Sequence, residues 1–353
     1  MFNNQKFVKV FIIIIGVFLL YHLSIWSIFT SKIFGRTDGL HVGDLGRMSY
    51  QVNMLKPRKL EHTLQKKHIN KTNWNNQKID IITIGDSFFN AGGGGKNPYF
   101  QDYLATIHDK NVLNIQNYKN TTMLETIVGL YNNGTLNKLK PKVIIIESIQ
   151  RELVSRFTKD IDFSFSLDTN TIKDLLEDRV DEKVLPSVLQ INTANYKLAF
   201  YYFKYMNNIN AVKEVYKFNL NKNMFSSKTS DELLVYHDDI KRLNHFNANS
   251  IKKINDTLNK LAEILKTLHI KLIFMPVVDK YDLYFDFIED NAYPKNSFFT
   301  LIRKMEKNYY FVDTKKILLP LLEEKDIYYP DDTHWSYKAS EILAEDTIFN
   351  DTL

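Results

Sequence analysis

The longest apolar run of the chain lies near its amino terminus. Residues 10–29 carry no formal charge, and Lys6 and Lys9 stand just before them. As a helix, this run spans about 30 Å, the thickness of a hydrocarbon core. Tyr21 and Trp26 fall toward its far end, where aromatic residues favour the membrane interface. The pattern predicts one transmembrane helix.

The basic residues before this run determine the expected orientation. They favour a cytoplasmic tail at residues 1–9, so the rest of the protein is expected outside the cytoplasm, anchored to the cell membrane by a single span. A cleaved signal peptide is the alternative. Signal peptides have apolar regions of about 7 to 15 residues and a small-residue cleavage site. The triplet at 27–29, Ser-Ile-Phe, offers no such site, so an uncleaved anchor is favoured.

Residues 30–78 are polar and basic and show no sustained apolar period. They are predicted to form a juxtamembrane stalk. Lys56, Arg58 and Lys59 either contact phospholipid headgroups or are simply solvated. Solvation is favoured because short runs of charge are weak signals.

The pattern changes at residue 79, where aliphatic, β-branched runs begin to alternate with helical stretches. The predicted strands are 79–84, 111–115, 142–147 and 271–278, and the predicted helices are 99–107, 122–132 and 250–268. Such alternation predicts an α/β fold with a parallel sheet flanked by helices. Ligands of these sheets bind beyond the carboxyl ends of the strands.

Residues 152–249 interrupt this alternation. They contain a charged stretch at 171–185 and an aromatic stretch at 196–205. We predict a helical insertion here, within one large domain that covers residues 79–353.

The composition excludes several classes of chemistry. The chain has 353 residues, a formal net charge of +5 and no cysteine. Disulfides, cysteine nucleophiles, thiolate zinc sites and iron–sulfur clusters are therefore excluded. The small positive charge gives little support to nucleic-acid binding. The histidines lack a convincing set of further ligands, so neither a metal nor a cofactor is expected.

Two motifs far apart in the chain carry the candidate chemistry. Ser87 ends the motif GDS after the first predicted strand, at the edge where α/β proteins place nucleophiles. Near the other end, DDTHW at 331–335 places His334 just after two aspartates. A histidine that accepts a serine proton needs an acid on its other ring nitrogen. Ser87, His334 and Asp332 are therefore predicted to form a catalytic triad.

Each motif alone has an ordinary explanation. Asp86 can cap a helix, and Ser87 can satisfy a backbone amide. The combination is stronger because it pairs a strand end with a mutually consistent mechanism, although the absence of G-x-S-x-G speaks against an ordinary α/β-hydrolase elbow. The four glycines at 92–95 either let a glycan approach the backbone closely or form a flexible surface loop.

IGDSFF at 84–89, after a strand, and YYPDDTHWSYKAS at 328–340 together resemble the SGNH-hydrolase superfamily, in its branch of alginate and cell-wall O-acetyltransferases. The likeness covers residues 79–348 except the insertion, and it implies a three-layer, flavodoxin-like parallel sheet. That branch reads Asp-Thr-His-Trp, as at 332–335. GDSL-type esterases instead place the acid three residues before the histidine, at Asp331. Both carboxylates remain open as partners of His334, and Asp332 is favoured.

The resemblance also implies donors to an oxyanion, although this chain departs from the usual pattern. The glycine of the second block has its nearest equivalent in Asn120. The asparagine of the third block is replaced by Gln150, which is followed by Arg151. Amide and guanidinium groups can donate to an oxyanion. The alternatives are that Asn120 serves a turn and that Arg151 pairs with a carboxylate.

The resemblance implies a membrane-anchored, extracytoplasmic O-acetyltransferase. His334 would deprotonate Ser87, an acetyl-serine would form, and a hydroxyl of a cell-wall or exported polysaccharide would collect the acetyl group. Acetyl-coenzyme A is cytoplasmic, so a partner must pass acetyl groups across the membrane. In similar families this partner is a multi-pass membrane-bound O-acyltransferase.

Two other classes of function use the same fold. An extracellular carbohydrate acetyl esterase would keep the triad and pass the acetyl group to water. A non-catalytic glycan-binding or assembly protein would not need Ser87. The anchor and the resemblance favour the transferase.

Overall fold

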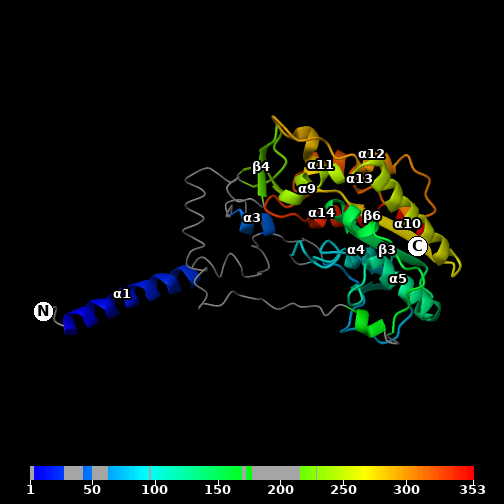
Figure 1. Ribbon diagram of the computed structural model, residues 1–353, viewed down its shortest axis with the longest axis horizontal. Coiled ribbons are helices and arrows are strands. Elements are labelled where there is room, and N and C mark those ends of the chain that lie inside the picture. Colours follow the sequence, from blue (N-terminus) through cyan, green and yellow to red (C-terminus); the bar gives the residue numbers. More distant parts are fainter. Residues whose placement is uncertain are drawn as a thin grey trace.

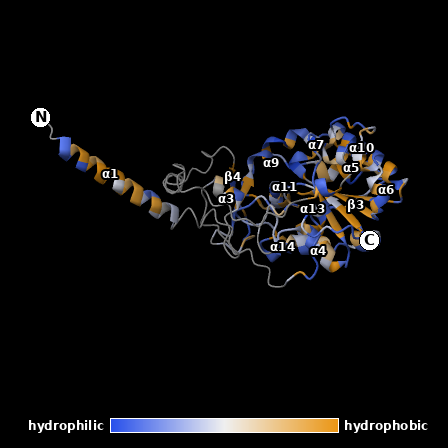
Figure 2. Ribbon diagram, turned by 90° about the horizontal axis from the view of Figure 1, so that it is seen from below, coloured by the Kyte–Doolittle hydropathy of each residue, from blue (hydrophilic) through white to orange (hydrophobic). Residues whose placement is uncertain are grey.

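A computed structural model of the protein describes residues 4–27, 43–49, 63–94, 97–168, 172–176, 215–227 and 229–353. Figure 1 shows a long helix, α1 (Asn4–Ile25), that stands apart from a body of strands and helices. The segment Asn4–Ser24 is long and apolar enough, by length and composition, to cross a membrane. Its large apolar side chains are exposed. In Figure 2 the ribbon of α1 is mostly orange, the colour of hydrophobic residues.

The body is built on a five-stranded sheet in the order β2-β1-β3-β6-β7, and every neighbouring pair is parallel. Numbered along the chain within this sheet, the strands lie in the order 2-1-3-4-5, which is that of a doubly wound sheet. Their bounds are β1 (Ile81–Ile84), β2 (Val112–Ile115), β3 (Val143–Ile149), β6 (Lys271–Val277) and β7 (Tyr310–Phe311). The four strands expected from the sequence are confirmed, and β7 is an addition.

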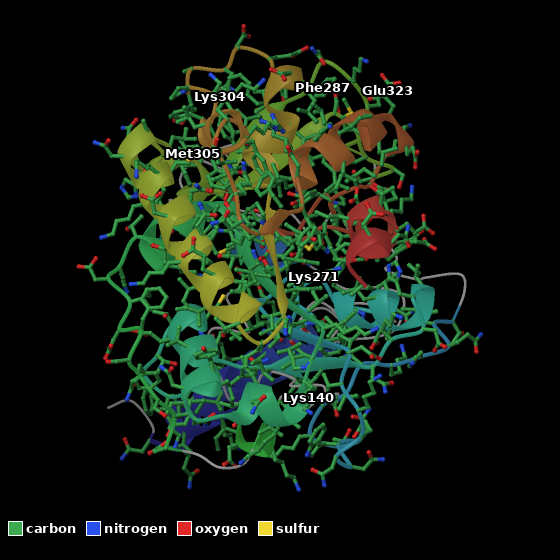
Figure 3. The ribbon with its side chains drawn as sticks, turned by 90° about the vertical axis from the view of Figure 1, so that its right-hand side faces the viewer. Lys140, Lys271, Phe287, Lys304, Met305 and Glu323 are labelled. Atoms are coloured by element: carbon green, nitrogen blue, oxygen red, sulfur yellow. The ribbon has the colours of Figure 1, made fainter. Side chains whose placement is uncertain are left out.

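Burial explains why these segments are strands. Every residue of β1, β2 and β3 is buried. A strand covered on both faces reads as a nearly continuous apolar run. These three strands do so, apart from Thr83, Asn114, Glu147 and Ser148. The amino ends of β3 and β6 are marked by the exposed residues Lys140, three positions before β3, and Lys271, the first residue of β6 (Figure 3).

Helices flank the sheet. The longer ones are α4 (Phe100–Ile107), α5 (Met123–Asn132), α10 (Ala248–Lys266) and α14 (Tyr337–Ala344). Helix α4 packs beside α14, and α10 packs beside α5 and α7. The shorter helices are α3 (Asp44–Met48), α6 (Thr135–Leu139), α7 (Leu153–Phe157), α9 (His237–Lys241), α11 (Lys280–Tyr284), α12 (Phe298–Ile302), α13 (Thr314–Leu318) and α15 (Thr347–Thr352). Short 3₁₀ turns are η3 (Gln150–Glu152), η4 (Ile172–Leu175), η6 (Leu243–His245), η7 (Phe285–Phe287) and η8 (Leu319–Glu324).

Local sequence explains where the main helices begin. Thr122 caps α5 by accepting from the Glu125 amide, while the Glu125 side chain accepts from the Thr122 amide. Asn247 caps α10 in the same reciprocal way with Ser250. The helix then buries one apolar stripe against the sheet, and this stripe includes the positions expected from the sequence: Ile251, Ile254, Leu258, Leu261 and Leu265.

The insertion at 152–249 differs from the helical segment that was expected. Its described part contains short helices and an antiparallel pair of strands, β4 (Val215–Asn219) and β5 (Glu232–Tyr236). Buried Leu233 and Val235 anchor β5 in the main core, while Leu234 faces a second small cluster. The aromatic stretch at 196–205 and most of the charged stretch at 171–185 lie outside the described residues.

The expected stalk at 30–78 is also corrected, because two parts of it belong to the body. Residues 63–78 pack along the sheet edge, where the Ile69 amide donates to the Val112 carbonyl and the Asn114 amide donates to the Ile69 carbonyl. Residues 43–49 form α3, whose Leu45 is fully buried. The basic residues at 56–59 lie outside the described part.

Candidate active site

Ser87 lies just beyond the carboxyl end of β1, next to the end of β3. This edge between β1 and β3 is the switch point at which doubly wound sheets bind ligands. The Ser87 side chain is exposed. The turn before it requires a glycine, because a Cβ at Gly85 would lie 2.4 Å from a carboxyl oxygen of Glu147.

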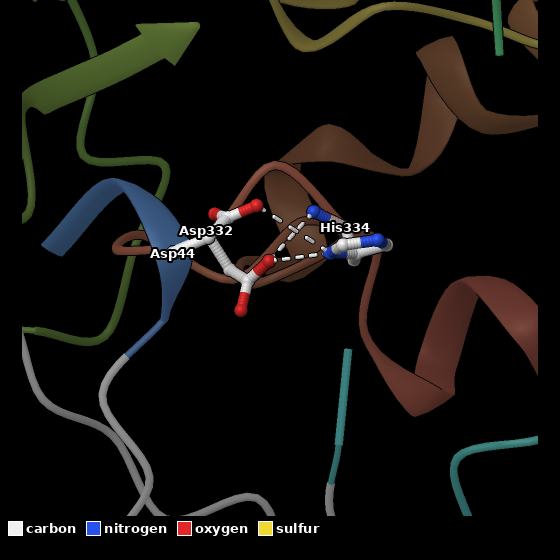
Figure 4. Close-up of side chains that lie close together, drawn as sticks. All are labelled: Asp44, Asp332 and His334. Carbon is white, nitrogen blue, oxygen red and sulfur yellow. Dashed lines mark hydrogen bonds and ion pairs between the residues drawn. The ribbon is translucent and has the colours of Figure 1, made fainter. Parts of the chain in front are cut away.

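A chain of hydrogen bonds connects Ser87 with the C-terminal loop. The Ser87 hydroxyl lies 2.7 Å from Nε2 of His334. On the other side of the ring, Nδ1 of His334 lies 2.6 Å from Oδ1 of Asp332, a contact that Figure 4 shows. A carboxylate can only accept, so Nδ1 carries the proton and the neutral ring accepts at Nε2. The structure thus brings together the three residues of the predicted triad.

The two adjacent aspartates have different partners. Asp332 accepts from both the ring and the backbone amide of His334. Asp331 instead accepts from the Gly43 amide at 2.7 Å. The carboxylate that orients His334 in the structure is therefore that of Asp332, two residues before the histidine.

The surroundings of His334 favour its protonated form. Burial alone would lower the pKa of the imidazole, but the charge and hydrogen bond of Asp332, followed by the charge of Asp44, outweigh burial. The net effect raises the pKa of His334 above its ordinary value of 6.5. A more basic imidazole is a stronger proton acceptor.

Lys280 holds the loop that carries Asp332. Its side chain is 1% exposed, and Nζ donates to the carbonyls of Tyr329, Pro330 and Asp332 at 2.7, 3.0 and 3.1 Å. Burial lowers the pKa of Lys280 to about 8, although the neighbouring carboxylates oppose this shift. Three hydrogen bonds from one buried ammonium fix the loop backbone beside the histidine.

Gly92 and Gly93 pack against His334. A Cβ at Gly92 would lie 2.1 Å from Nε2 of His334, so this position has no room for a side chain. At Gly93 the nearest atom to such a Cβ is the Trp335 carbonyl oxygen, at 3.2 Å. Packing against the imidazole therefore restricts Gly92 to glycine, which differs from the flexible surface loop that was one of the two expectations for this run.

Two pockets meet at Ser87. One, of about 430 Å³, is lined mainly by polar groups of the turns after β1, β2 and β3: Ser87, Asn90, Gln116, Asn117, Thr121, Thr122, Ser155, Arg156 and Lys159. The other, of about 420 Å³, lies between that edge and the elements α3, β5 and α9, and it includes Ser87, Asp44, Arg151, Tyr236, Arg242 and Thr333. The hydroxyl is thus reachable from two sides.

Beneath Ser87, two carboxyl groups have opposite electrostatic environments. Burial alone would raise the pKa of Asp86, but Arg156, at 2.5 Å, and the Ile149 and Phe88 amides lower it overall. Glu147 is fully buried, and burial followed by the charge of Asp86 raises its pKa well above the ordinary value. Its Oε2 accepts from the Asp86 amide at 2.8 Å.

The three residues expected to donate to an oxyanion either lie outside the pockets at Ser87 or bind other side chains. Asn120 is exposed, has a φ of 59° and lines neither pocket. The Gln150 amide group donates to Asp282 and accepts from the Asp279 amide, so it points into the interior. Arg151 lines the second pocket, but its guanidinium pairs with Asp239 and Asp279 at 3.1 and 3.3 Å.

Other groups are better placed to donate. No hydrogen bond in the described part of the chain uses the Ser87 amide, and this amide lies on the nucleophile itself. Asn117 is exposed in the first pocket, and within the described residues its side chain has no partner. Asn117 lies on the same loop as Asn120, and of these two residues Asn117 is the one that lines a pocket with Ser87.

Asp44, from α3, is the functional residue that the sequence gave least reason to expect. Its carboxylate accepts from the amide and the hydroxyl of Thr333 and lies 3.9 Å from Nδ1 of His334. Figure 4 shows Asp44 and Asp332 approaching the same side of the imidazole. In the sequence Asp44 is only part of a Gly-Asp pair in a polar segment, and such a pair gives no signal for this contact.

Within the described part of the chain, one group of side chains has a spacing that could suit a metal ion. It consists of Asp44, Asp332 and His334, and one ligand atom of each lies within 4.8 Å of the others. Both carboxylate oxygens of Asp44 accept from Thr333, and Oδ1 of Asp332 accepts from Nδ1 of His334. Nε2, the remaining imidazole nitrogen, faces Ser87. The arrangement is accounted for by hydrogen bonding.

No protein-family model matches the chain, and neither the curated proteins nor the solved structures contain a significant match.

Replacing Gly92 with alanine is expected to displace the His334 ring, because the added methyl overlaps Nε2. The rate at which a fluorophosphonate probe labels Ser87 should fall at least about tenfold, since a misaligned base costs one to two powers of ten. Gly93→Ala adds the same methyl without touching Nε2 and serves as the control. Equal labelling of the two variants, both folded by circular dichroism, would contradict this role of Gly92.

The raised pKa of His334 leads to a pH prediction. The ring must be neutral to accept the Ser87 proton, so labelling of Ser87 should fall as the pH drops through the pKa of His334. Because this pKa is raised, the midpoint should lie above 6.5. Rates measured between about pH 5 and 9 test this. A midpoint below 6.5, or a flat profile, would show that His334 is not the base or is not held by Asp332.

Proposed function

We propose that the protein is a serine-dependent O-acetyltransferase, anchored in the cell membrane, that acetylates a hydroxyl of a cell-wall or exported polysaccharide outside the cytoplasm. The observation that carries the proposal is the hydrogen-bonded chain from Asp332 through His334 to the exposed hydroxyl of Ser87. Its setting at the β1–β3 edge, its likeness to SGNH-type motifs and the apolar helix α1 add support.

In the first half-reaction, Nε2 of His334 takes the Ser87 proton while Oγ attacks the carbonyl carbon of the acetyl donor. The tetrahedral intermediate then collapses, His334 returns the proton to the leaving group, and acetyl-Ser87 remains. Asp332 keeps the imidazole in the correct tautomer and stabilises the imidazolium that forms. The raised pKa of His334 is consistent with this role.

The intermediate needs donors to its negative oxygen. The Ser87 amide is the first, since it lies on the nucleophile and has no other acceptor within the described residues. The Asn117 amide group, from the loop after β2, is the second candidate. Each such donor contributes about 3 kcal/mol to the transition state, so two of them would supply a large part of the rate enhancement.

In the second half-reaction, a sugar hydroxyl gives its proton to His334 and attacks the acetyl-serine carbonyl, which regenerates Ser87. The first pocket suits this acceptor, because its amides and hydroxyls, among them Asn90, Gln116 and Thr121, match the hydrogen-bonding capacity of a sugar. The second pocket, on the α3 side, leaves a separate route for the donor. Two approaches to one serine would let the donor and the acceptor each reach it without competing for one pocket.

The donor must be brought to the outer side of the membrane. In the families that this chain resembles, a multi-pass membrane-bound O-acyltransferase supplies acetyl groups there. The helix α1 would hold the catalytic body beside such a partner. No cofactor of its own is required, because the acetyl group travels through Ser87 alone.

Ser87→Ala is expected to abolish acetylation of the polysaccharide in cells that express the full chain, because no acetyl-serine can form. Ester-linked acetate on the isolated polymer is the measurement, and membrane levels of the variant serve as the control. Acetylation that survives in Ser87→Ala but disappears on deletion of the chain would favour a non-catalytic assembly role.

A second arm separates the transferase from an esterase. The detergent-solubilised full chain is given a chromogenic acetyl ester with and without oligosaccharides of the host polymer. A transferase should yield acetylated oligosaccharide at a rate that rises with acceptor concentration, and chelation of metals should leave this rate unchanged. Release of acetate that no oligosaccharide affects would support the esterase instead.

A further inference from the structure

The loop that carries the base is completed by a piece of chain from the membrane-proximal side. We infer that Asp44, on α3, is a positioning residue of the active site and that residues 43–49 must dock on the Asp332–His334 loop for Ser87 to be fully reactive. This inference rests on the proposed function of Ser87 and His334. It adds a requirement for a segment that the sequence places outside the catalytic domain.

The contacts of Asp44 converge on Thr333, the residue between the acid and the base. The Thr333 amide donates to Oδ1 of Asp44 at 2.7 Å, and the Thr333 hydroxyl donates to Oδ2 at 2.5 Å. Holding both groups of Thr333 fixes the backbone from which Asp332 and His334 project. The Asp44 carboxylate therefore sets the spacing of the acid and the base.

Asp44 also acts on the imidazole through its charge. Its Oδ2 lies 3.9 Å from Nδ1 of His334, beyond a hydrogen bond but close enough for a strong charge interaction at a buried site. Of the charged groups that act on His334, Asp332 and Asp44 raise its pKa, and Arg151 lowers it. Removal of the Asp44 charge should therefore make His334 easier to deprotonate.

The rest of the segment is built to dock on the same loop. The Gly43 amide donates to the Asp331 carboxylate at 2.7 Å, and the Gly46 amide donates to the Asp331 carbonyl at 2.8 Å. A Cβ at Gly43 would lie 2.0 Å from that carbonyl oxygen, so the two backbones touch. Leu45 is fully buried in a small cluster with Val215 and Leu234.

This arrangement links the anchor to the chemistry. Seventeen residues, 26–42, separate the end of α1 at Ile25 from Gly43. A fully extended chain of that length reaches at most about 60 Å, so the loop that carries His334 is tethered within this distance of the membrane helix. A catalytic body without residues 43–49 would keep its sheet and lose part of its active site.

The test uses the detergent-solubilised full chain and two variants, Asp44→Ala and Asp44→Asn. Labelling of Ser87 by a fluorophosphonate probe is followed as a function of pH. Asp44→Ala should label at least about tenfold more slowly, because the loop loses both hydrogen bonds to Thr333. Asp44→Asn removes the charge and should move the acid limb of the profile to lower pH.

The matched control is Asp313→Ala. Asp313 caps α13 through the Lys316 amide and pairs with Arg303, and neither contact involves the triad, so its loss should affect unfolding without changing the rate or the acid limb. If both Asp44 variants, folded by circular dichroism, keep the wild-type rate and acid limb, the inference is wrong. A lower unfolding temperature alone would indicate a merely structural role and would also contradict it.

Thr333→Val keeps the test decisive if the Asp44 variants do not fold. It removes the hydroxyl that donates to Asp44 and leaves the carboxylate in place, and Thr333→Ser should restore the rate. Equal rates for the valine and serine variants would overturn the inference. A wild-type chain that is folded but never labelled at Ser87 would instead contradict the proposed function, so the two failures are distinguishable.

Discussion

The hydrogen bond between Ser87 and His334 joins residues 247 positions apart. The sheet and the C-terminal loop must both be held in place for this contact to form. The Ser87 hydroxyl, just beyond β1, must lie within hydrogen-bonding distance of the His334 ring, on a buried loop near the carboxyl terminus. The sheet supplies one side, because β1 is paired on both edges and is fully buried. The other side is a loop without regular structure, and it needs other means of support.

Tyr328 and Trp335 anchor this loop in the apolar core, and a set of polar contacts adds to that support. Lys280 donates to three carbonyls of the loop, Asp331 accepts from Gly43, and Asp44 accepts twice from Thr333. Buried polar groups of this kind cost free energy unless every member is satisfied. Once satisfied, they define one geometry rather than a family of similar ones, as an active site needs. Precision at His334 therefore comes from this network together with the Phe88 ring, whose centroid lies 4.7 Å from that of the imidazole.

Much of the sheet could be predicted because buried parallel strands leave a direct trace in the sequence. The apolar runs of β1, β2, β3 and β6 were recognised in this way. Strand β7 has only two residues, and β4 and β5 lie in a segment without a clear hydrophobic pattern. The triad could be predicted because short motifs mark Ser87, Asp332 and His334. The contacts of Asp44 and Lys280 could not be predicted, because they join segments that are distant in the sequence. Gln150 shows the converse: its residue type suits an oxyanion donor, but buried partners turn it inward.

The account depends most directly on whether Ser87 becomes covalently acetylated. The solubilised full chain should be exposed briefly to an activated acetyl ester without any acceptor, quenched in acid, and analysed by intact-protein and peptide mass spectrometry. We expect a mass increase of one acetyl group, located on the peptide that contains Ser87 and absent from Ser87→Ala. It should disappear on addition of an acceptor oligosaccharide. Turnover of the ester with no acetyl group on Ser87, or equal acetylation in Ser87→Ala, would contradict the account.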